Sequence, residues 1–284
     1  MKIGISGMGK VGCSLQRSLK LQGITAICAP GMRRQKLEPE EAAEVTVGSL
    51  INLLQKAQVI FLTVPDSQIK QSADNLVQLA QQEQLSLTSK TFFHCSGAGD
   101  VALLQSLAQA GANIGSWHPL QSFANGQGSF KDIYIALDGQ AAVRKIGEQV
   151  ARLLGSYSFY VPPQARRQYH AAACLTSNYI VTLLAIAQAL LAKWTVSEAE
   201  ALQALLPLLR GTVANLEQVT LARKALTGPI ARGDLVTVKE HLSVLPPATI
   251  ALYKALGSSA AQLALANGTI ESNQYHELEH LFRN

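Results

Sequence analysis

The stretch MKIGISGMGKVG, Met1–Gly12, decides the fold of the amino-terminal half of the chain. A short apolar strand runs directly into the spacing Gly-x-Gly-x-x-Gly. The first glycine allows a tight turn, the second lets backbone N–H groups approach a pyrophosphate, and the third lets the next helix pack against the strand. The amino terminus of that helix would direct its dipole and its unpaired N–H groups at the phosphates. We therefore expect a dinucleotide to bind at Gly7, Met8, Gly9, Lys10, Val11 and Gly12.

The end of the second expected strand, residues 24–29, indicates which dinucleotide is preferred. NAD sites place an acidic residue about 20 residues beyond the glycines, where it binds the ribose 2′-hydroxyl. Here no acid precedes Glu38, and Arg33 and Arg34 stand in its place. Guanidinium groups suit a 2′-phosphate, so we expect NADP (NADPH), with Val64 and Pro65 as further contacts. The alternative for Arg33 and Arg34 is that both are solvated loop charges. The alternative for the glycine motif is a strand–helix turn that binds no nucleotide.

Length, composition and net charge limit the classes of protein to which this chain can belong. The 284 residues are 48% hydrophobic and 15% charged, as expected for a globular chain of two domains. The net charge is +5 without a run of Lys or Arg, so we expect no nucleic-acid partner. Four cysteines without C-x-x-C spacing, and a start directly on a strand, favour a reduced, cytoplasmic protein.

Strand and helix signals alternate through the first half. Apolar runs rich in β-branched or aromatic residues predict strands at 3–6, 24–29, 59–64, 91–95, 114–117, 133–137 and 158–161. Helical patterns lie between most of them, which predicts an α/β fold with a doubly wound, Rossmann-like parallel sheet. Beyond Pro162-Pro163 no strand is expected. We therefore predict an NADP-binding domain at residues 1–162 and an all-helical substrate or dimerisation domain at 163–284.

One long helix is predicted over residues 169–194, and its stretch 171–192 carries no charge. That length would cross a bilayer, but the stretch contains Thr, Ser, Asn and Gln residues. We interpret it as a buried central helix and expect no membrane span. Such a helix is buried more readily in a dimer than in a small lone domain, which predicts a homodimer through the C-terminal half.

Three segments follow expected strands at the edge where doubly wound sheets bind ligands. Asp66, after Pro65, would either cap the next helix or lie in a loop against the dinucleotide. Ser96 would donate to a nicotinamide carboxamide or a substrate oxygen, or serve only as a turn residue. His118, kept extended by Pro119, would face the site or bond to a loop carbonyl.

The long helix offers a second group of candidates. His170, Cys174 and Asn178 follow one another at intervals of four residues, and Ser177 lies seven residues after His170. At 3.6 residues per turn these four form one polar strip in an otherwise apolar helix. Polar groups in a buried helix need partners or a ligand. We therefore expect His170 and Asn178 to contact substrate, with Ser177 beside them, unless the strip is a contact between helices.

A third group lies at residues 225–234, where Gly228-Pro229 and Gly233 indicate a rigid loop. Arg232 in this loop would hold a substrate carboxylate or pair with Asp234. No metal site is expected. The H-E-x-x-H pattern at residues 276–280 would need a third ligand downstream, and too few residues follow it.

Together these motifs resemble one family of Rossmann-like oxidoreductases whose C-terminal helical domain is a domain of unknown function. The resemblance rests on the glycine turn and on VPD at 64–66, SGA at 96–98, HPL at 118–120, YHAAA at 169–173, SNY at 177–179 and LTGPI at 226–230 with RGD at 232–234. The family is similar in architecture to ketopantoate reductases, pyrroline-5-carboxylate reductases and the 6-phosphogluconate dehydrogenase-like group. The resemblance implies an NADP-linked reductase with a dimerising helical domain.

The chain departs from the β-hydroxyacid dehydrogenase branch of that group, which uses a helix Lys with an Asn four residues later. Here Cys174 precedes Asn178 by four residues. A catalytic chain must then use His170 or His118 as proton donor, with Asn178 and Ser96 orienting the substrate. We expect an NADPH-dependent reductase of a small carbonyl or imine compound, such as a ketopantoate-like 2-oxo acid. The alternative is a non-catalytic NADP-binding sensor or regulatory protein.

Overall fold

The computed structural model describes residues 1–29, 39–124, 126 and 128–283. Its contacts divide the chain into two compact units, residues 1–178 and 179–284. The strands are β1 (Ile3–Ser6), β2 (Ile27–Ala29), β3 (Val59–Leu62), β4 (Thr91–His94), β5 (Asn113–Pro119), β6 (Tyr134–Gly139) and β7 (Tyr157–Tyr160). The α-helices of the first unit are α1 (Lys10–Leu21), α2 (Pro39–Lys56), α3 (Ile69–Gln82), α4 (Gln105–Gln109), α5 (Ala141–Leu153) and α6 (Arg166–Thr176).

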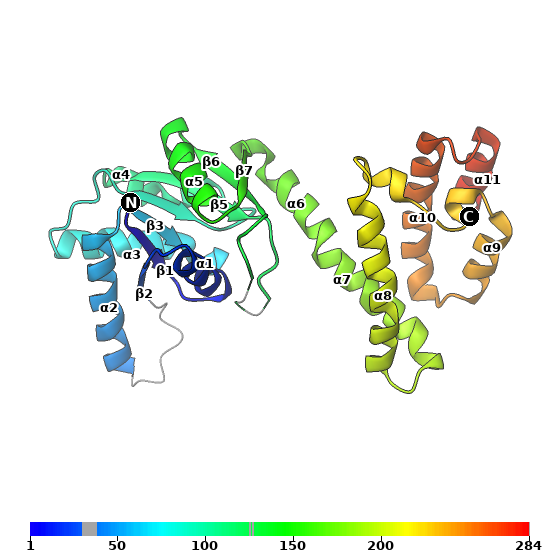
Figure 1. Ribbon diagram of the computed structural model, residues 1–284, viewed down its shortest axis with the longest axis horizontal. Helices are drawn as coiled ribbons and strands as arrows, with labels where there is room; N and C mark the ends of the chain where they lie inside the picture. Colours follow the sequence, from blue (N-terminus) through cyan, green and yellow to red (C-terminus); the bar gives the residue numbers. More distant parts are fainter. Residues whose placement is uncertain (30–38, 125, 127, 284) are drawn as a thin grey trace. The chain divides into compact units, whose positions relative to one another are not determined.

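All seven strands form one sheet in the order β2-β1-β3-β4-β5-β6-β7 (Figure 1). Every neighbouring pair is parallel except β5 and β6, which run antiparallel. The prediction of a Rossmann-like α/β fold with a parallel sheet is confirmed, except that β5 and β6 pair antiparallel. Within the described residues no helix joins β5 to β6, and parallel strands are usually joined by such a crossover helix.

Apolar side chains cover both faces of the sheet. On one face α1 and α5 pack against Phe61, Phe93 and Trp117. On the other face α2, α3 and α4 pack around Ile60 and Phe92. Burial on both faces explains why β1 and β3 read as continuous apolar runs, and it leaves the carboxyl ends of the strands for the site.

Helix α6 begins after the 3₁₀ turn Pro163–Ala165 and packs with the first unit. Arg166, its first residue, is fully buried and bonds to backbone carbonyls after β4. The two compact units therefore divide at Asn178, later in the chain than the domain boundary near residue 163 that the sequence predicts.

The described residues of the second unit form helices and loops, with no strand among them. The unit contains α7 (Asn178–Leu191), α8 (Glu198–Glu217), α9 (Leu235–Val244), α10 (Pro247–Asn267) and α11 (Ser272–Arg283), with short 3₁₀ turns between them. Ser197 caps α8, because its hydroxyl accepts from the N–H of Glu200 at 3.2 Å. Val238, Ala261 and Leu278 lie in a small core between α9, α10 and α11.

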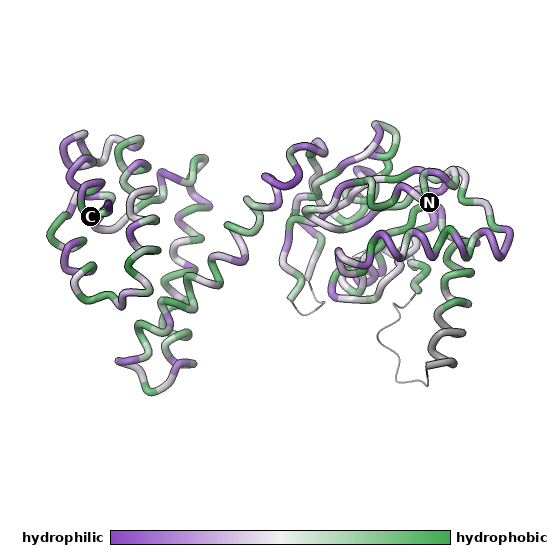
Figure 2. The backbone as a smooth tube through the Cα atoms, turned by 180° about the vertical axis from the view of Figure 1, so that it is seen from behind, coloured by the Kyte–Doolittle hydropathy of each residue, from purple (hydrophilic) through white to green (hydrophobic). Residues whose placement is uncertain are grey.

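The single helix predicted over 169–194 is instead two helices, α6 and α7, separated at Ser177 (φ −111°, ψ −69°). Ser and Asn side chains compete for backbone hydrogen bonds, which favours an interruption at Ser177-Asn178. The expectation of burial is wrong for the single chain. The segment Pro163–Trp194 has a mean hydropathy of 1.6 over its most apolar window, yet none of that window is buried. Figure 2 shows α7 as a largely apolar helix.

By length and composition this segment would also be able to cross a membrane, a property it shares with core helices of soluble proteins.

Candidate functional site

The glycine turn after β1 has the geometry of a phosphate cradle. Gly7 has φ +103°, and a Cβ there would lie 2.9 Å from Val64 Cγ1. A Cβ at Gly12 would overlap the carbonyl oxygen of Gly7, so α1 can approach the strand only without a side chain. At Gly9 a Cβ would meet only the Thr63 carbonyl oxygen, at 3.8 Å. Gly9 is therefore open on the side from which a ligand would approach.

The start of α1 has unmet hydrogen-bonding capacity. Gly9 is its N-cap and makes no side-chain cap bond, and the first turn contains no acidic residue. The backbone N–H groups of Lys10, Val11 and Gly12 are then available to an anion, which helix N-termini favour. The cradle fits the pyrophosphate of a dinucleotide. Val64 lies against Gly7, which puts the loop after β3 beside the cradle. Arg33 and Arg34, predicted to read a 2′-phosphate, lie outside the described residues.

Ser96, in the loop after β4, is bonded to the loop after β3. Its hydroxyl donates to Asp66 Oδ2 at 2.6 Å and accepts from the N–H of Gly99 at 2.9 Å. Its own N–H donates to His94 Nδ1 at 3.2 Å. Because Ser96 is only 3% exposed and its proton is given to Asp66, its geometry suits shaping the loop. Asp66 does not cap a helix: the N-cap position before residues 66–68 is Pro65.

Arg166 holds the same loop from the other side. Its Nη2 donates to the carbonyl oxygens of Ser96 at 2.8 Å and Gly97 at 3.2 Å. Its Nε and Nη1 are buried without partners among the described residues. The guanidinium is thus a buried positive charge beneath the loop.

Two histidines converge on Gly97. A Cβ on this glycine would lie 2.9 Å from His118 Nε2 and 2.5 Å from His170 Nδ1. The other ring nitrogens have partners of their own. His118 Nδ1 lies 2.6 Å from the Tyr169 hydroxyl, and His170 Nε2 lies 3.6 Å from Cys174 Sγ. We call His118, Tyr169, His170 and Cys174 the two-histidine cluster.

The electrostatics of the cluster follow from burial and from Arg166. Burial, the Arg166 guanidinium and His170 lower the pKa of His118 to about 4. Burial raises the pKa of Tyr169 to about 12 although Arg166 opposes the shift. At neutral pH both side chains are therefore uncharged, His118 with one ring proton and Tyr169 with its hydroxyl proton.

A row of buried polar residues crosses the sheet beside the cluster. The strand register pairs His94 with Ser116 and Ser116 with Asp138. Each has a buried polar atom without a partner among the described residues: His94 Nε2, Ser116 Oγ and Asp138 Oδ2. Burial lowers the pKa of His94 to about 4 and raises that of Asp138. Such a row is suited to ordered water between its members.

The remaining predicted residues belong to other elements or to element ends. Ser177 is the end of α6 and Asn178 is the first residue of α7, so the helix break interrupts the predicted strip after Cys174. Arg232 is exposed in a 3₁₀ turn of the second unit. Its neighbour Asp234 caps α9, accepting from the N–H of Thr237 at 3.1 Å and from its hydroxyl at 2.7 Å.

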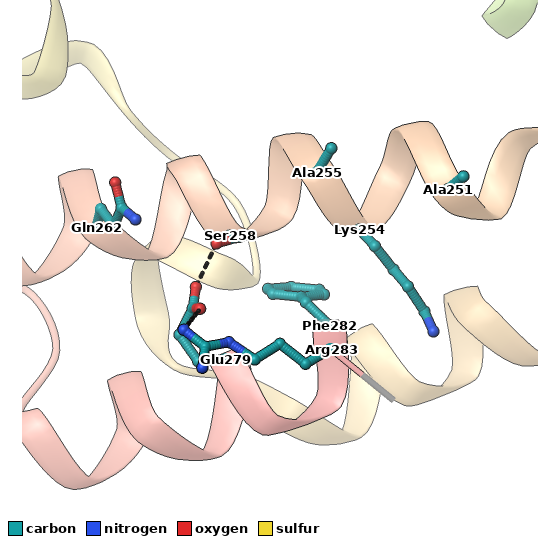
Figure 3. Close-up of a pocket in the computed structure, with 8 residues that line it drawn as sticks. All are labelled: Ala251, Lys254, Ala255, Ser258, Gln262, Glu279, Phe282 and Arg283. Atoms are coloured by element: carbon teal, nitrogen blue, oxygen red, sulfur yellow. Dashed lines mark hydrogen bonds and ion pairs between the residues drawn. The ribbon is translucent and has the colours of Figure 1, made fainter.

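Hollows lie among the described residues of the second unit. The first lies between α10 and α11, where Figure 3 shows Ser258 bonded to Glu279. Arg283 pairs with that carboxylate at 3.3 Å. The H-E-x-x-H helix thus uses the buried Glu279 for packing against α10. The second hollow is lined by the LTGPI motif together with His241 and Tyr253, whose Nδ1 and hydroxyl lie 2.8 Å apart.

Sequence reasoning missed Arg166, Tyr169 and the partnership of Asp66 with Ser96. Nothing local distinguishes Arg166, which is buried, from Arg167, which is exposed. Tyr169 directly precedes His170 in the YHAAA motif, so the sequence indicates that it lies near the site. Its contact with His118 depends on how α6 packs against β5.

Comparisons with known proteins agree with this architecture. Residues 1–119 match a Rossmann-like domain, and residues 133–260 match a domain of unknown function, DUF2520. The chain thus combines a Rossmann-like N-terminal domain with a DUF2520 C-terminal domain. No curated protein matches the chain by sequence.

Solved structures share the fold at low identity. A candidate NADP oxidoreductase from Bacteroides fragilis has a TM-score of 0.68 and 20% identity, over 92% of this chain and 98% of its own. Plasmodium falciparum pyrroline carboxylate reductase with NADP bound has a TM-score of 0.60 and 12% identity, over 97% and 98%. An imine reductase from Myxococcus stipitatus in complex with NADP+ has a TM-score of 0.52 and 15% identity, over 100% and 93%. These likenesses show a fold shared with NADP-dependent reductases.

Proposed function

We propose that this protein is an NADPH-dependent reductase of a small carbonyl or imine compound, a class that includes 2-oxo acids. The observation that carries the proposal is a continuous set of contacts along one edge of the sheet. Gly7 of the cradle lies against Val64 in the loop after β3, and Asp66 in that loop bonds to Ser96 in the loop after β4. Gly97, also in the loop after β4, lies against His118 and His170. In doubly wound sheets this edge is where ligands bind.

The role of each residue in this proposal follows from its chemistry. NADPH, when bound, would supply a hydride. Residues 7–12 would hold its pyrophosphate through backbone N–H groups. Reduction of C=O or C=N creates a basic oxygen or nitrogen that needs a proton, and His118 and His170 are the proton-bearing groups that face Gly97. Ser96 and Arg166 would keep the loop carrying Gly97 in place.

The fold relatives support the choice of cofactor and reaction class. Two of them were solved with NADP bound, one as a pyrroline carboxylate reductase and one as an imine reductase. Their names describe reductases, and the cradle of this chain is suited to the same kind of dinucleotide.

The exposed apolar helix supports a homodimer as part of the same proposal. Leu175 is 60% exposed at the end of α6, and Val181 is 67% exposed on α7. Exposed apolar stretches of this length are found at protein interfaces. A second copy of the chain, packed through its own C-terminal helices, would cover them.

The test is consumption of NADPH in the presence of a panel of 2-oxo acids and cyclic or acyclic imines. We expect turnover with at least one compound, and a loss of at least about 100-fold in His170→Ala or His118→Ala while NADPH affinity stays within about twofold. Tight binding of NADPH with no consumption across the panel would instead favour a sensor. Unchanged turnover in both variants would remove the histidines from the role of proton donor.

A further inference from the structure

Tyr169 is the residue of the two-histidine cluster that contacts His118. It comes from α6, whereas His118 comes from β5, so their contact is made by packing and not by sequence proximity. The hydroxyl lies 2.6 Å from His118 Nδ1, and the two rings meet edge to face at 5.6 Å with an interplanar angle of 84°. A distance this short between a phenol and an imidazole is a hydrogen bond.

The direction of that bond depends on the tautomer of His118. Both groups are uncharged at neutral pH, since burial and Arg166 disfavour the charged form of His118 and burial disfavours tyrosinate. A neutral imidazole has one N–H and one acceptor nitrogen. If the Tyr169 hydroxyl donates to Nδ1, the ring proton of His118 lies on Nε2, the nitrogen that faces Gly97.

A neutral histidine has only that proton to give. Losing it without replacement would leave an imidazolate, which is far too basic to form at neutral pH. The transfer is feasible when Nδ1 gains a proton at the same time. Tyr169 is the group that bonds to Nδ1, and it is half-buried, so its oxygen can recover a proton from water.

We propose that Tyr169 and His118 form a proton relay in which Tyr169 fixes the Nε2–H tautomer and replaces the proton that His118 donates. The replacement of the donated proton rests on the proposed reductase function, whereas the tautomer of His118 does not. The substrate oxygen or nitrogen gains the Nε2 proton, Nδ1 gains the hydroxyl proton, and water returns a proton to the tyrosinate. Exchange with water then puts a proton back on Nε2 as Nδ1 loses its own, which restores the starting tautomer. Together with a hydride from NADPH, the substrate gains one hydride and one proton overall, and that proton comes from solvent. Tyr169 is thus a positioning residue that acts through His118.

Gly97 completes the arrangement. Any side chain there would meet both His118 Nε2 and His170 Nδ1. His170 Nδ1 is buried without a partner among the described residues, so hydrogen-bonding capacity is unmet at this same point. A ligand atom or a water held over the loop would satisfy it.

The first test needs neither substrate nor cofactor. Long-range proton–nitrogen NMR correlation on the ¹⁵N-labelled full chain reports which ring nitrogen of each histidine carries the proton, and His118→Gln identifies the signals. We expect a single Nε2–H tautomer for His118 at pH 7, and a mixture of tautomers in Tyr169→Phe. An Nδ1–H tautomer in the unaltered protein, or no change in Tyr169→Phe, would overturn the proposal.

The second test separates the relay from the proposed function. With a substrate found in the NADPH panel, Tyr169→Phe should lower kcat by about 10- to 100-fold with little change in KM. Tyr157→Phe is the matched control, because Tyr157 is 55% exposed and outside the cluster. Equal turnover in Tyr169→Phe and Tyr157→Phe would refute the relay. If no compound is reduced at all, the reductase function fails while the tautomer result stands or falls separately.

Discussion

Arg166 is the single residue on which the loop after β4 depends most. The residue is 1% exposed, and its guanidinium donates to two successive carbonyl oxygens, those of Ser96 and Gly97. An arginine can do this because its fork presents several N–H groups in fixed directions. The same charge helps to keep His94 and His118 neutral.

Arg166→Met should therefore destabilise the first unit by about 2 kcal/mol, since two buried carbonyls lose their donors. Arg167→Met is the matched control, because Arg167 is exposed on the same helix, and its effect should be within about 0.5 kcal/mol. Urea unfolding monitored by fluorescence measures both. Equal free energies of unfolding for the two variants would show that the buried contacts of Arg166 contribute nothing.

The depressed pKa of His94 makes stability depend on pH. The folded state resists protonation down to about pH 4, whereas the unfolded chain takes up the proton near its ordinary value of 6.5. The contribution of His94 is thus fully present above pH 6.5 and is lost as pH falls from 6.5 toward 4, by up to about 1.4 kcal/mol per pH unit. His118 acts in the same direction, and the raised pKa of Asp138 acts against it. Urea unfolding at pH 7 and pH 5 should show the loss, with a smaller loss in His94→Asn; a pH-independent free energy would contradict it.

At the scale of the elements, the loop between β4 and the following 3₁₀ turn brings the chemistry together. Its position depends on Gly97, where a Cβ would lie 2.5 Å from His170 Nδ1. The cradle belongs to a different element pair, β1 and α1. Damage to the loop should therefore leave the cradle intact.

Gly97→Ala should displace both imidazoles, lower the free energy of unfolding by about 1–3 kcal/mol and abolish any turnover, while NADPH affinity stays unchanged. Gly48→Ala is the matched control, since a Cβ at this position of α2 meets nothing within 4 Å. It should be neutral or stabilising by about 0.5–1 kcal/mol. Calorimetry with NADPH and thermal unfolding of both variants check this, and a Gly97→Ala protein with full turnover would refute it.

The elements that could be predicted from sequence are those whose signals are local. The prediction for β1 has the same bounds as the structure, Ile3–Ser6, because the strand is a short apolar run that ends at the glycine turn. The antiparallel direction of β6 depends on the connection after β5, which carries no helical period. Helix α8 continues to Glu217 through Pro207 and Gly211, although both residues disfavour a helix interior.

The candidate site divides in the same way. His118 and His170 were predicted separately, from a strand end and from a helix, and the structure brings them together over Gly97. Arg166, the contact of Tyr169 with His118 and the bond between Asp66 and Ser96 were missed, because they exist only through contacts between distant elements. A sequence read one segment at a time shows polar residues, but not which of them face each other.

At the scale of the whole molecule, the unburied apolar segment α6–α7 is the feature that a single chain leaves unexplained. Dimerisation through the C-terminal helices predicts that charge introduced on α7 separates the copies. Val181→Glu should shift the mass measured by light scattering from dimer to monomer, because a buried carboxylate without a partner opposes association. Val196→Glu, at a position 95% exposed between α7 and α8, should remain a dimer. A monomeric unaltered protein would contradict the proposal.

The central claim is that the turn Gly7–Gly12 binds NADPH, and isothermal titration calorimetry on Gly9→Ala tests it most directly. A Cβ at Gly9 meets only the Thr63 carbonyl oxygen at 3.8 Å, so the variant should fold with an unchanged unfolding temperature. We predict that the unaltered chain binds one NADPH, and that Gly9→Ala binds it at least about tenfold more weakly, a cost of about 1.4 kcal/mol. No binding of NADPH or NADP+ to the unaltered chain, or equal affinity in the folded variant, would contradict the account.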